Sequence, residues 1–359
     1  MAAPRSSPRI PRRSTGDPDL DRSIAALLAS VALSSSDKDG RLDNRDQLRD
    51  LLTTAVQMAM DTAEGRADRL DVKIAAAALS EMRDAYLTFG PHRATRKVTI
   101  FGSARTQPSD PLYAQTRAVA KAFADRGWMV VTGAGPGIMA AGLEGAGRDN
   151  ALGVSISLPF ESTANEYVDG DRLVDMRYFF TRKLALIRES AGFVVMPGGF
   201  GTLDEAFELL TLLQTGKATP VPVVMLGLGH GYWTAWQQFV EKVADEGYVS
   251  SSDNQLYVVT NDTSVAVDEI CGFYANFHSI RWVRDVLVVR MQRGPTDVQL
   301  ASARASFAEF IDADGIWRTE PLPPELSEHD QLELARVAMR FNRRQPGRLR
   351  GLIDTVNGW

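Results

Sequence analysis

The sequence is short of cysteine, of long apolar runs and of net positive charge, and each shortage excludes a class of protein. Cys271 is the only cysteine in 359 residues, which excludes an internal disulfide framework and a thiolate metal cluster. No run of about 18 apolar residues occurs, so neither a membrane-spanning helix nor a secretory signal is expected. With a net charge of −5, the chain has no domain-scale basic surface for binding nucleic acid. These shortages favour a location in the reducing cytoplasm.

Histidine is scarce as well. The four histidines are scattered, without the spacing of zinc ligands, so no metal and no cofactor is expected. The rest of the composition is ordinary for a globular protein, at 44% hydrophobic and 24% charged. Residues 1–19 depart from it, because arginine, serine and proline dominate there and nothing could bury a core. We therefore expect a disordered tail at 1–19.

Residues 20–92 predict a helical extension. Apolar residues recur at helical spacing in 20–36 and 41–89, which are rich in alanine, leucine and methionine. The pair Gly90-Pro91 is typical of a helix end. The alanine-rich face is expected to pack either on the main domain or on a partner subunit, and the pattern does not decide between them.

Residues 97–278 have the pattern of an α/β domain. Six short β-branched runs end in small or polar residues, and helical stretches lie between most of them. Such alternation indicates a Rossmann-like, doubly wound parallel sheet with helices on both faces. The expected strands lie in 97–104, 127–135, 151–159, 192–199, 221–227 and 255–262, and the expected helices in 112–126, 137–148, 181–190, 202–216 and 232–246.

Residues 279–359 are expected to form a separate α+β appendage. The run at 282–294 predicts a strand, and 297–311 predicts a helix. A turn and a proline-rich connection are expected over 312–328, followed by a final helix at 329–344.

The stretch "VVMPGGFGTLDEAFELL", residues 194–210, carries three glycines between a buried strand and a helix. Thr202 and Glu205 have the spacing of a capping box, so the stretch could serve the fold alone. Alternatively, the glycines let main-chain N–H groups approach a phosphate at the helix start, where the helix dipole favours an anion. A helix start of that kind would not ordinarily carry Asp204 and Glu205 unless one of them has another role. This conflict points to catalysis.

A second glycine-rich turn, "TGAGPG" at 132–137, also follows a strand and opens a helix. It lacks the G-x-G-x-x-G spacing of a dinucleotide site, and no clear ribose-binding acid follows it. Two glycine turns at the carboxyl ends of neighbouring strands instead suggest a mononucleotide held between them.

The stretch "YFFTRKLALIRES" places Arg182 and Lys183 at the start of a helix. They could be a surface pair. Positive charge at a helix N-terminus opposes the dipole, however, so a compensating anion nearby is expected, and either a phosphate or Glu205 could supply it.

Taken together, "PGGFGTLDE", "YFFTRK", "SLPFE" and Asn165 resemble the Lonely-Guy (LOG) family, phosphoribohydrolases formerly described as lysine decarboxylases, and most of all its larger bacterial branch. The resemblance covers Lys97 to Ala275, about half of the chain. The 23 residues between Arg182 and Glu205 fit the arginine-glutamate pair of the family. "GSA" and "GAGPG" differ from the plant-type members, which leaves specificity for cytokinin open.

The resemblance implies hydrolysis of the N-glycosidic bond of a nucleoside 5'-monophosphate, giving free base and ribose 5-phosphate. The substrate would be AMP, a related purine nucleotide or a cytokinin ribotide, and the protein a homodimer or larger homo-oligomer. Glu205 would be the carboxylate that stabilises the ribosyl cation and accepts a proton from water, with Arg182 as its catalytic partner. The implied substrate-binding residues are Ser103, Gly135, Gly137, Glu161, Lys183, Gly198, Gly199, Gly201, Thr202, Glu208 and Thr211.

Two other functions are open to the same fold. One is a non-catalytic protein that binds a nucleotide or a molybdopterin-type cofactor, and release of ribose 5-phosphate from AMP would distinguish it from the enzyme. The other is a pyridoxal-phosphate-dependent lysine decarboxylase. That activity needs a lysine placed for a Schiff base with a partner for the pyridinium nitrogen, and the sequence offers no such pair.

Overall fold

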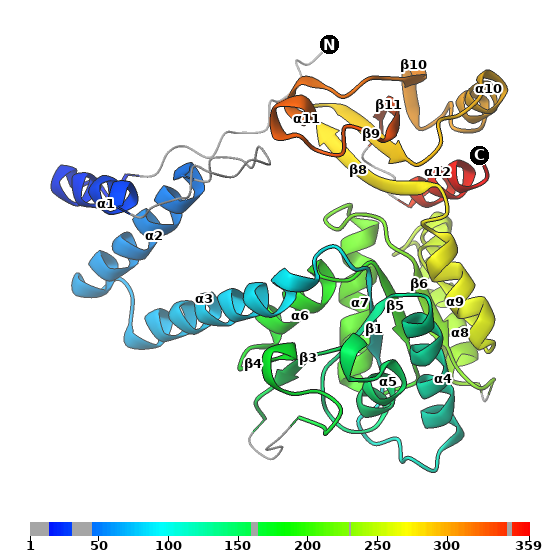
Figure 1. The fold of residues 1–359 in the computed structure, drawn as a ribbon, viewed down its shortest axis with the longest axis horizontal. Helices are drawn as coiled ribbons and strands as arrows, with labels where there is room; N and C mark the ends of the chain where they lie inside the picture. The colour runs from blue at the N-terminus through cyan, green and yellow to red at the C-terminus, as the bar shows by residue number, and fades with distance from the viewer. Residues whose placement is uncertain (1–13, 31–44, 159–163, 230, 343–346) are drawn as a thin grey trace.

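The computed structural model describes residues 14–30, 45–158, 164–229, 231–342 and 347–359 (Figure 1). Residues 1–13 of the expected disordered tail lie outside this part of the chain. Of its remaining residues, Pro18 and Asp19 already belong to the first helix.

A seven-stranded sheet forms the centre of the chain, with the order β4-β3-β2-β1-β5-β6-β7 and parallel pairing throughout. This confirms the expected Rossmann-like α/β fold. The strands are β1 (Lys97–Phe101), β2 (Met129–Thr132), β3 (Ala151–Ile156), β4 (Leu173–Met176), β5 (Gly192–Val195), β6 (Val223–Leu226) and β7 (Val258–Thr260). The order of strands reverses between β1 and β5, and sheets of this kind bind ligands at the carboxyl ends of the strands beside such a switch point.

Helices cover both faces of this sheet. One face packs on α4 (Pro111–Asp125), α5 (Ile138–Ala146) and α9 (Thr263–Gly272), through a core that includes Phe123 and Ile270. The other packs on α6 (Phe179–Arg188), α7 (Phe200–Gln214) and α8 (Tyr232–Asp245), through Leu186, Leu209 and Trp236 among others. Short 3-10 helices lie at η1 (Gly90–His92), η2 (Arg148–Asn150), η3 (Gly170–Arg172) and η4 (Ser251–Leu256).

Two elements of this domain are not in the sequence-based expectation. Strand β4 has only four residues and lies at the edge of the sheet, so its apolar run is too short to predict. The sequence-based expectation contains no helix at 263–272, where α9 lies, although Asp262 caps it by accepting hydrogen bonds from the N–H groups of Ser264 and Val265.

The N-terminal extension consists of α1 (Pro18–Ser30), α2 (Arg45–Ala63) and α3 (Arg69–Phe89). The second half of α3 packs on the α/β domain, because Glu81, Ala85 and Phe89 fall on one helical stripe and are all buried. Helices α1 and α2 extend away from the sheet (Figure 1).

The C-terminal part forms a four-stranded antiparallel sheet with the order β10-β11-β9-β8. Its elements are β8 (Phe277–Val283), β9 (Val286–Met291), α10 (Asp297–Ser306), β10 (Ile311–Arg318), α11 (Pro323–Glu328), β11 (Ala335–Phe341) and α12 (Arg348–Asn357). Helices α10 and α12 pack on one face of the sheet, where Leu300 and Leu352 join the strand residues in one core.

Three details of the expected appendage are wrong. The run at 282–294 is not one strand but part of a hairpin, which turns at Arg284 with a φ of 59°. The proline-rich segment 312–328 begins with a strand and ends in α11. The expected helix at 329–344 contains β11, because Val337, Met339 and Phe341 alternate onto the core face between two neighbouring strands.

Candidate functional site

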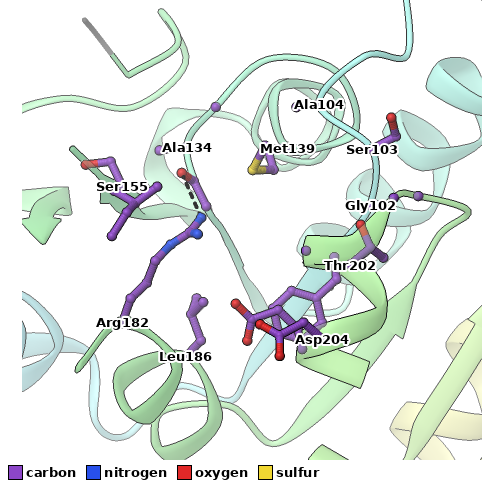
Figure 2. Close-up of a pocket in the computed structure, with 18 of the residues that line it drawn as sticks. Gly102, Ser103, Ala104, Ala134, Met139, Ser155, Arg182, Leu186, Thr202 and Asp204 are labelled. Carbon is purple, nitrogen blue, oxygen red and sulfur yellow. Dashed lines mark hydrogen bonds between the residues drawn. The ribbon is translucent and has the colours of Figure 1, made fainter. Parts of the chain in front are cut away.

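A cavity of about 950 Å³ opens at the carboxyl ends of β1, β2, β3 and β5, at the switch point of the sheet. Figure 2 shows side chains from several elements around it, among them Met139, Arg182 and Thr202. Its size is within the range of small-molecule sites.

The turns after β1, β2 and β5 are joined to one another through their main chains. The N–H of Ser103 donates to the carbonyl of Pro197 at 3.2 Å, and the N–H of Ile138 donates to the carbonyl of Ser103 at 3.0 Å. Gly137 makes this approach possible, because it has a φ of +68° and a Cβ there would lie 2.4 Å from the carbonyl oxygen of Ser103. The predicted residue Gly137 therefore shapes the turn and does not line the cavity.

Helix α7 begins at the cavity without a side-chain cap among the described residues. Its N-cap is Gly199, and Thr202 lies three positions into the helix. The capping box considered for Thr202 and Glu205 is therefore wrong. Residues 198–205 all line the cavity, so the uncapped start of the helix, which an anion site requires, lies at the cavity.

The three glycines of this turn differ in what surrounds them. A Cβ on Gly198 would lie 2.1 Å from Oγ1 of Thr202, so this glycine is needed for packing. At Gly199 and Gly201 a Cβ would meet nothing within 4 Å. Neither of these two has a positive φ. The fold does not require glycine at 199 or 201, whereas a ligand held against the main chain would.

Glu205 is the buried acid of the cavity. Only 6% of the residue is exposed, and its Oε2 has no hydrogen-bond partner among the described residues. Burial raises the pKa of Glu205 to about 7, although the positive charges of Arg182 and Lys183 act in the opposite direction. A buried carboxyl group with an unsatisfied oxygen and a pKa near neutrality is typical of a functional site.

Arg182 extends from α6 across the cavity, where Figure 2 shows it directed toward the turn after β2. Its Nε donates to the carbonyl of Val154 at 2.9 Å, and its Nη2 donates to the carbonyl of Gly133 at 3.4 Å. The structure thus brings the two predicted catalytic residues, Arg182 and Glu205, to one cavity.

Several other predicted residues line the same cavity: Ser103, Gly135, Gly198, Gly199, Gly201 and Thr202. Lys183 and Glu208 do not. The ammonium of Lys183 instead lies 2.7 Å from a carboxylate oxygen of Asp204 and 2.7 Å from one of Glu208. Thr211 is exposed and donates to the carbonyl of Phe207 at 2.7 Å. Glu161 lies outside the described residues.

Some cavity residues were missed from the sequence. Asp175 lies in the unpredicted strand β4 and accepts a hydrogen bond from the hydroxyl of Ser155. Tyr232 donates from its hydroxyl to the carbonyl of Gly198 at 2.6 Å. Phe200 lies inside the glycine motif and is 94% exposed, an unusual exposure for an aromatic ring. Of these three residues, only Phe200 lies in a quoted sequence motif and could have been identified from it.

Lys183 does not suit Schiff-base chemistry. Burial lowers its pKa, but the hydrogen bonds to Asp204 and Glu208 outweigh burial and raise the pKa above its usual value. A Schiff-base lysine must lose its proton, and the described lining of the cavity contains no lysine. In the described part of the chain, no group of three or more histidine, cysteine, aspartate or glutamate residues could hold a metal ion, and no helix is long and apolar enough to cross a membrane.

The fold and the cavity define a Rossmann-like α/β protein with a cavity at the switch point of its sheet. Residues 134–270 match the family model described as "Possible lysine decarboxylase". The chain is 28% identical over 146 residues to the cytokinin riboside 5'-monophosphate phosphoribohydrolase LOG7 of Arabidopsis thaliana, which covers 40% of this chain and 64% of that protein. It is 30% identical over 124 residues to LOG4 of the same plant, which covers 34% and 55%.

Over the matched part of its α/β domain, the chain is therefore similar to the LOG phosphoribohydrolases. It spans less than two thirds of the length of these two curated relatives. Among solved structures, the molybdenum cofactor carrier protein of Chlamydomonas reinhardtii is 20% identical, with a TM-score of 0.35 over 49% of this chain and 98% of that one. The molybdenum cofactor binding protein of Rippkaea orientalis is 17% identical, with a TM-score of 0.35 over 48% and 94%. Likeness at this level carries no inference about a ligand.

Proposed function

We propose that this protein hydrolyses the N-glycosidic bond of a nucleoside 5'-monophosphate to free base and ribose 5-phosphate. One observation carries the proposal: a buried carboxyl group, Glu205, lies in the cavity at the switch point with an unsatisfied oxygen and a pKa of about 7. The names of the curated relatives, phosphoribohydrolases of cytokinin riboside 5'-monophosphates, support the reaction class.

In this mechanism the bond between C1' of the ribose and the base nitrogen breaks as water attacks C1'. The ribosyl group passes through an oxocarbenium-like cation, which the carboxylate of Glu205 stabilises. The same carboxylate accepts a proton from the attacking water as the water oxygen joins C1'. This proton then passes through solvent to the nitrogen of the departing base, which regenerates the carboxylate. A general base works best when its pKa lies near the operating pH, which the burial of Glu205 provides.

Arg182 favours the ionised form of Glu205. Its guanidinium is the largest of the influences that lower the pKa of Glu205 against the effect of burial. Arg182 therefore keeps a fraction of Glu205 ionised at neutral pH, in the form that stabilises the cation and accepts the proton.

The 5'-phosphate binds at the start of α7 in this proposal. The first turn offers uncapped N–H groups at the positive end of a helix of 15 residues, and the space beside Gly199 and Gly201 is open. Ser103 and the turn that contains Gly135 line the same cavity, and in this proposal they hold the ribose and phosphate.

The test is a panel of nucleoside monophosphates, including AMP and a cytokinin ribotide, with free base and ribose 5-phosphate measured separately. Equal amounts of the two products from at least one nucleotide support the proposal. Tight binding without any product would contradict it and favour the non-catalytic binding protein of the same fold. The panel also identifies the preferred base.

We also propose that the protein is a homodimer or larger homo-oligomer. Large apolar side chains are exposed along the N-terminal helices, including Leu51 on α2 and Leu70, Leu79 and Leu87 on α3. A second copy of the chain would remove this apolar surface from water.

A further inference from the structure

Glu81 connects the N-terminal extension to helix α6. Its Oε1 accepts a hydrogen bond from the main-chain N–H of Arg177 at 2.9 Å, and its Oε2 accepts one from the hydroxyl of Thr181 at 2.5 Å. The residue is only 6% exposed. A carboxylate from α3 is thus buried with both oxygens bonded to the start of another helix.

The start of α6 needs such a group. Its N-cap, Tyr178, makes no side-chain cap hydrogen bond, and the first turn contains no acidic residue. Arg182 and Lys183 follow directly, so two positive charges lie near the positive end of the helix dipole. The sequence predicts a compensating anion near this helix start, and Glu81 on α3 supplies it. Glu81 precedes Thr181 by 100 residues in the chain.

Arg182 is the residue immediately after Thr181, which Glu81 holds. The reach of its side chain to the carbonyls of Val154 and Gly133 therefore depends on where the first turn of α6 lies. The contact between α3 and α6 continues along both helices, because the guanidinium of Arg188 lies over the ring of Tyr86, 4.8 Å from its centroid.

We propose that Glu81 is a positioning residue for Arg182, so that the N-terminal extension is a part of the catalytic apparatus. The carboxylate fixes the first turn of α6, and this turn fixes the guanidinium in the cavity. The catalytic consequence rests on the proposed nucleotide hydrolysis. A misplacement of about 1 Å of a group at the reaction centre can lower a rate by about 100-fold.

The experiment compares Glu81→Ala with Asp84→Ala, a carboxylate on the same helix that is exposed and forms a salt bridge with Arg83. We expect Glu81→Ala to lower kcat with AMP roughly 10- to 100-fold and Asp84→Ala to leave it unchanged. Glu81→Gln should retain most of the rate. Its amide oxygen can accept from Arg177 while its NH₂ donates to the hydroxyl of Thr181, which also lies 2.9 Å from the carbonyl of Tyr178.

A double-mutant cycle separates positioning from a general loss of structure. If Glu81 acts through Arg182, then Glu81→Ala should change kcat by less than about twofold in an Arg182→Ala background. A full, multiplicative loss in that background would overturn the proposal, and so would an unchanged kcat in Glu81→Ala itself. If Glu81→Ala does not fold, Thr181→Val replaces it in the same cycle, because it removes the hydroxyl that Oε2 accepts from.

The cycle also has a readout that does not need turnover. If the wild-type protein releases no base from any nucleotide, the proposed function fails, and the same four proteins are compared by their affinity for AMP in calorimetry. A loss of affinity in Glu81→Ala that disappears in the Arg182→Ala background supports the positioning role. Additive losses, or no loss, reject it.

Discussion

Gly133 leaves the space that the guanidinium of Arg182 occupies. A Cβ on Gly133 would lie 1.9 Å from Nη2 of Arg182, and the same guanidinium donates to the carbonyl of Gly133. The glycine-rich turn after β2 thus has a packing role toward a charged side chain, in addition to any contact with a nucleotide.

Gly133→Ala should therefore displace Arg182 and lower kcat with AMP about 10-fold or more. The added methyl group would contact the side chains of Arg182 and Met139, so the fold should persist and the circular dichroism spectrum should not change. Gly272→Ala is the matched control, since a Cβ there meets nothing within 4 Å and Gly272 lies on α9, away from the cavity. Equal rates for wild type and Gly133→Ala would show that the position of Arg182 is unimportant.

Gly199→Ala tests the phosphate site at the start of α7. A methyl group at this position enters open space in the structure and would obstruct only a ligand that approaches the main chain. We expect kcat/KM for AMP to fall, with little change in the slow cleavage of adenosine, which lacks the phosphate. In the wild type, adenosine should be a poorer substrate than AMP by about 100-fold or more, because two or three charge-assisted hydrogen bonds are lost.

Similar efficiencies with adenosine and AMP would refute the phosphate site. Gly201→Ala gives a second check, because alanine inside a helix is about 1 kcal/mol more favourable than glycine. This variant should melt higher than the wild type and yet cleave AMP more slowly. Higher melting with full activity would place the phosphate elsewhere.

The raised pKa of Glu205 predicts how stability depends on pH. The folded protein holds the proton of Glu205 up to about pH 7, whereas the ordinary glutamate pKa of 4.5 applies to the unfolded chain. Between these values the folded state binds more protons, so this group lowers stability as the pH rises, by about 3 kcal/mol in total. Glu205→Gln should remove this penalty.

Thermal melting at pH 4.5 and pH 8.5 measures the effect. Glu205→Gln should raise the melting temperature relative to wild type at pH 8.5 and change it little at pH 4.5. Glu246→Gln, which alters a surface pair between Lys242 and Glu246, should show no such difference between the two values. A difference between wild type and Glu205→Gln that is the same at both pH values would contradict the raised pKa.

The proposed oligomer is checked by light scattering at micromolar concentration. We expect a mass of at least twice the 39.3 kDa of one chain. Replacing Leu79 and Leu87 on the exposed side of α3 by glutamate should lower the mass to that of a monomer. A monomeric wild type would contradict the proposal that a second copy of the chain covers the exposed leucines of the N-terminal helices.

The sequence predicts the α/β domain well, because its buried strands are short, β-branched and separated by amphipathic helices. The same rules fail at β11, because "LELARVAMR" is rich in strong helix formers and only the neighbouring strands select an extended chain. The two motifs "YFFTRK" and "PGGFGTLDE" also identify Arg182, Glu205, Gly199 and Gly201 as candidate residues. These residues lie at or near the ends of strands and helices beside the switch point. Local sequence could not show that Lys183 is bound to Asp204 and Glu208, or that Glu81 supplies the anion at α6, because these contacts depend on tertiary packing.

The most direct test of the account is the release of base and ribose 5-phosphate from AMP, or from the best nucleotide of the panel, by the wild type and by Glu205→Gln. The amide keeps the size of the side chain but cannot accept the proton of water or carry the negative charge that stabilises the ribosyl cation. The account predicts equal amounts of the two products from the wild type and a turnover at least about 100-fold lower in the folded variant. Near-normal turnover in folded Glu205→Gln would contradict it.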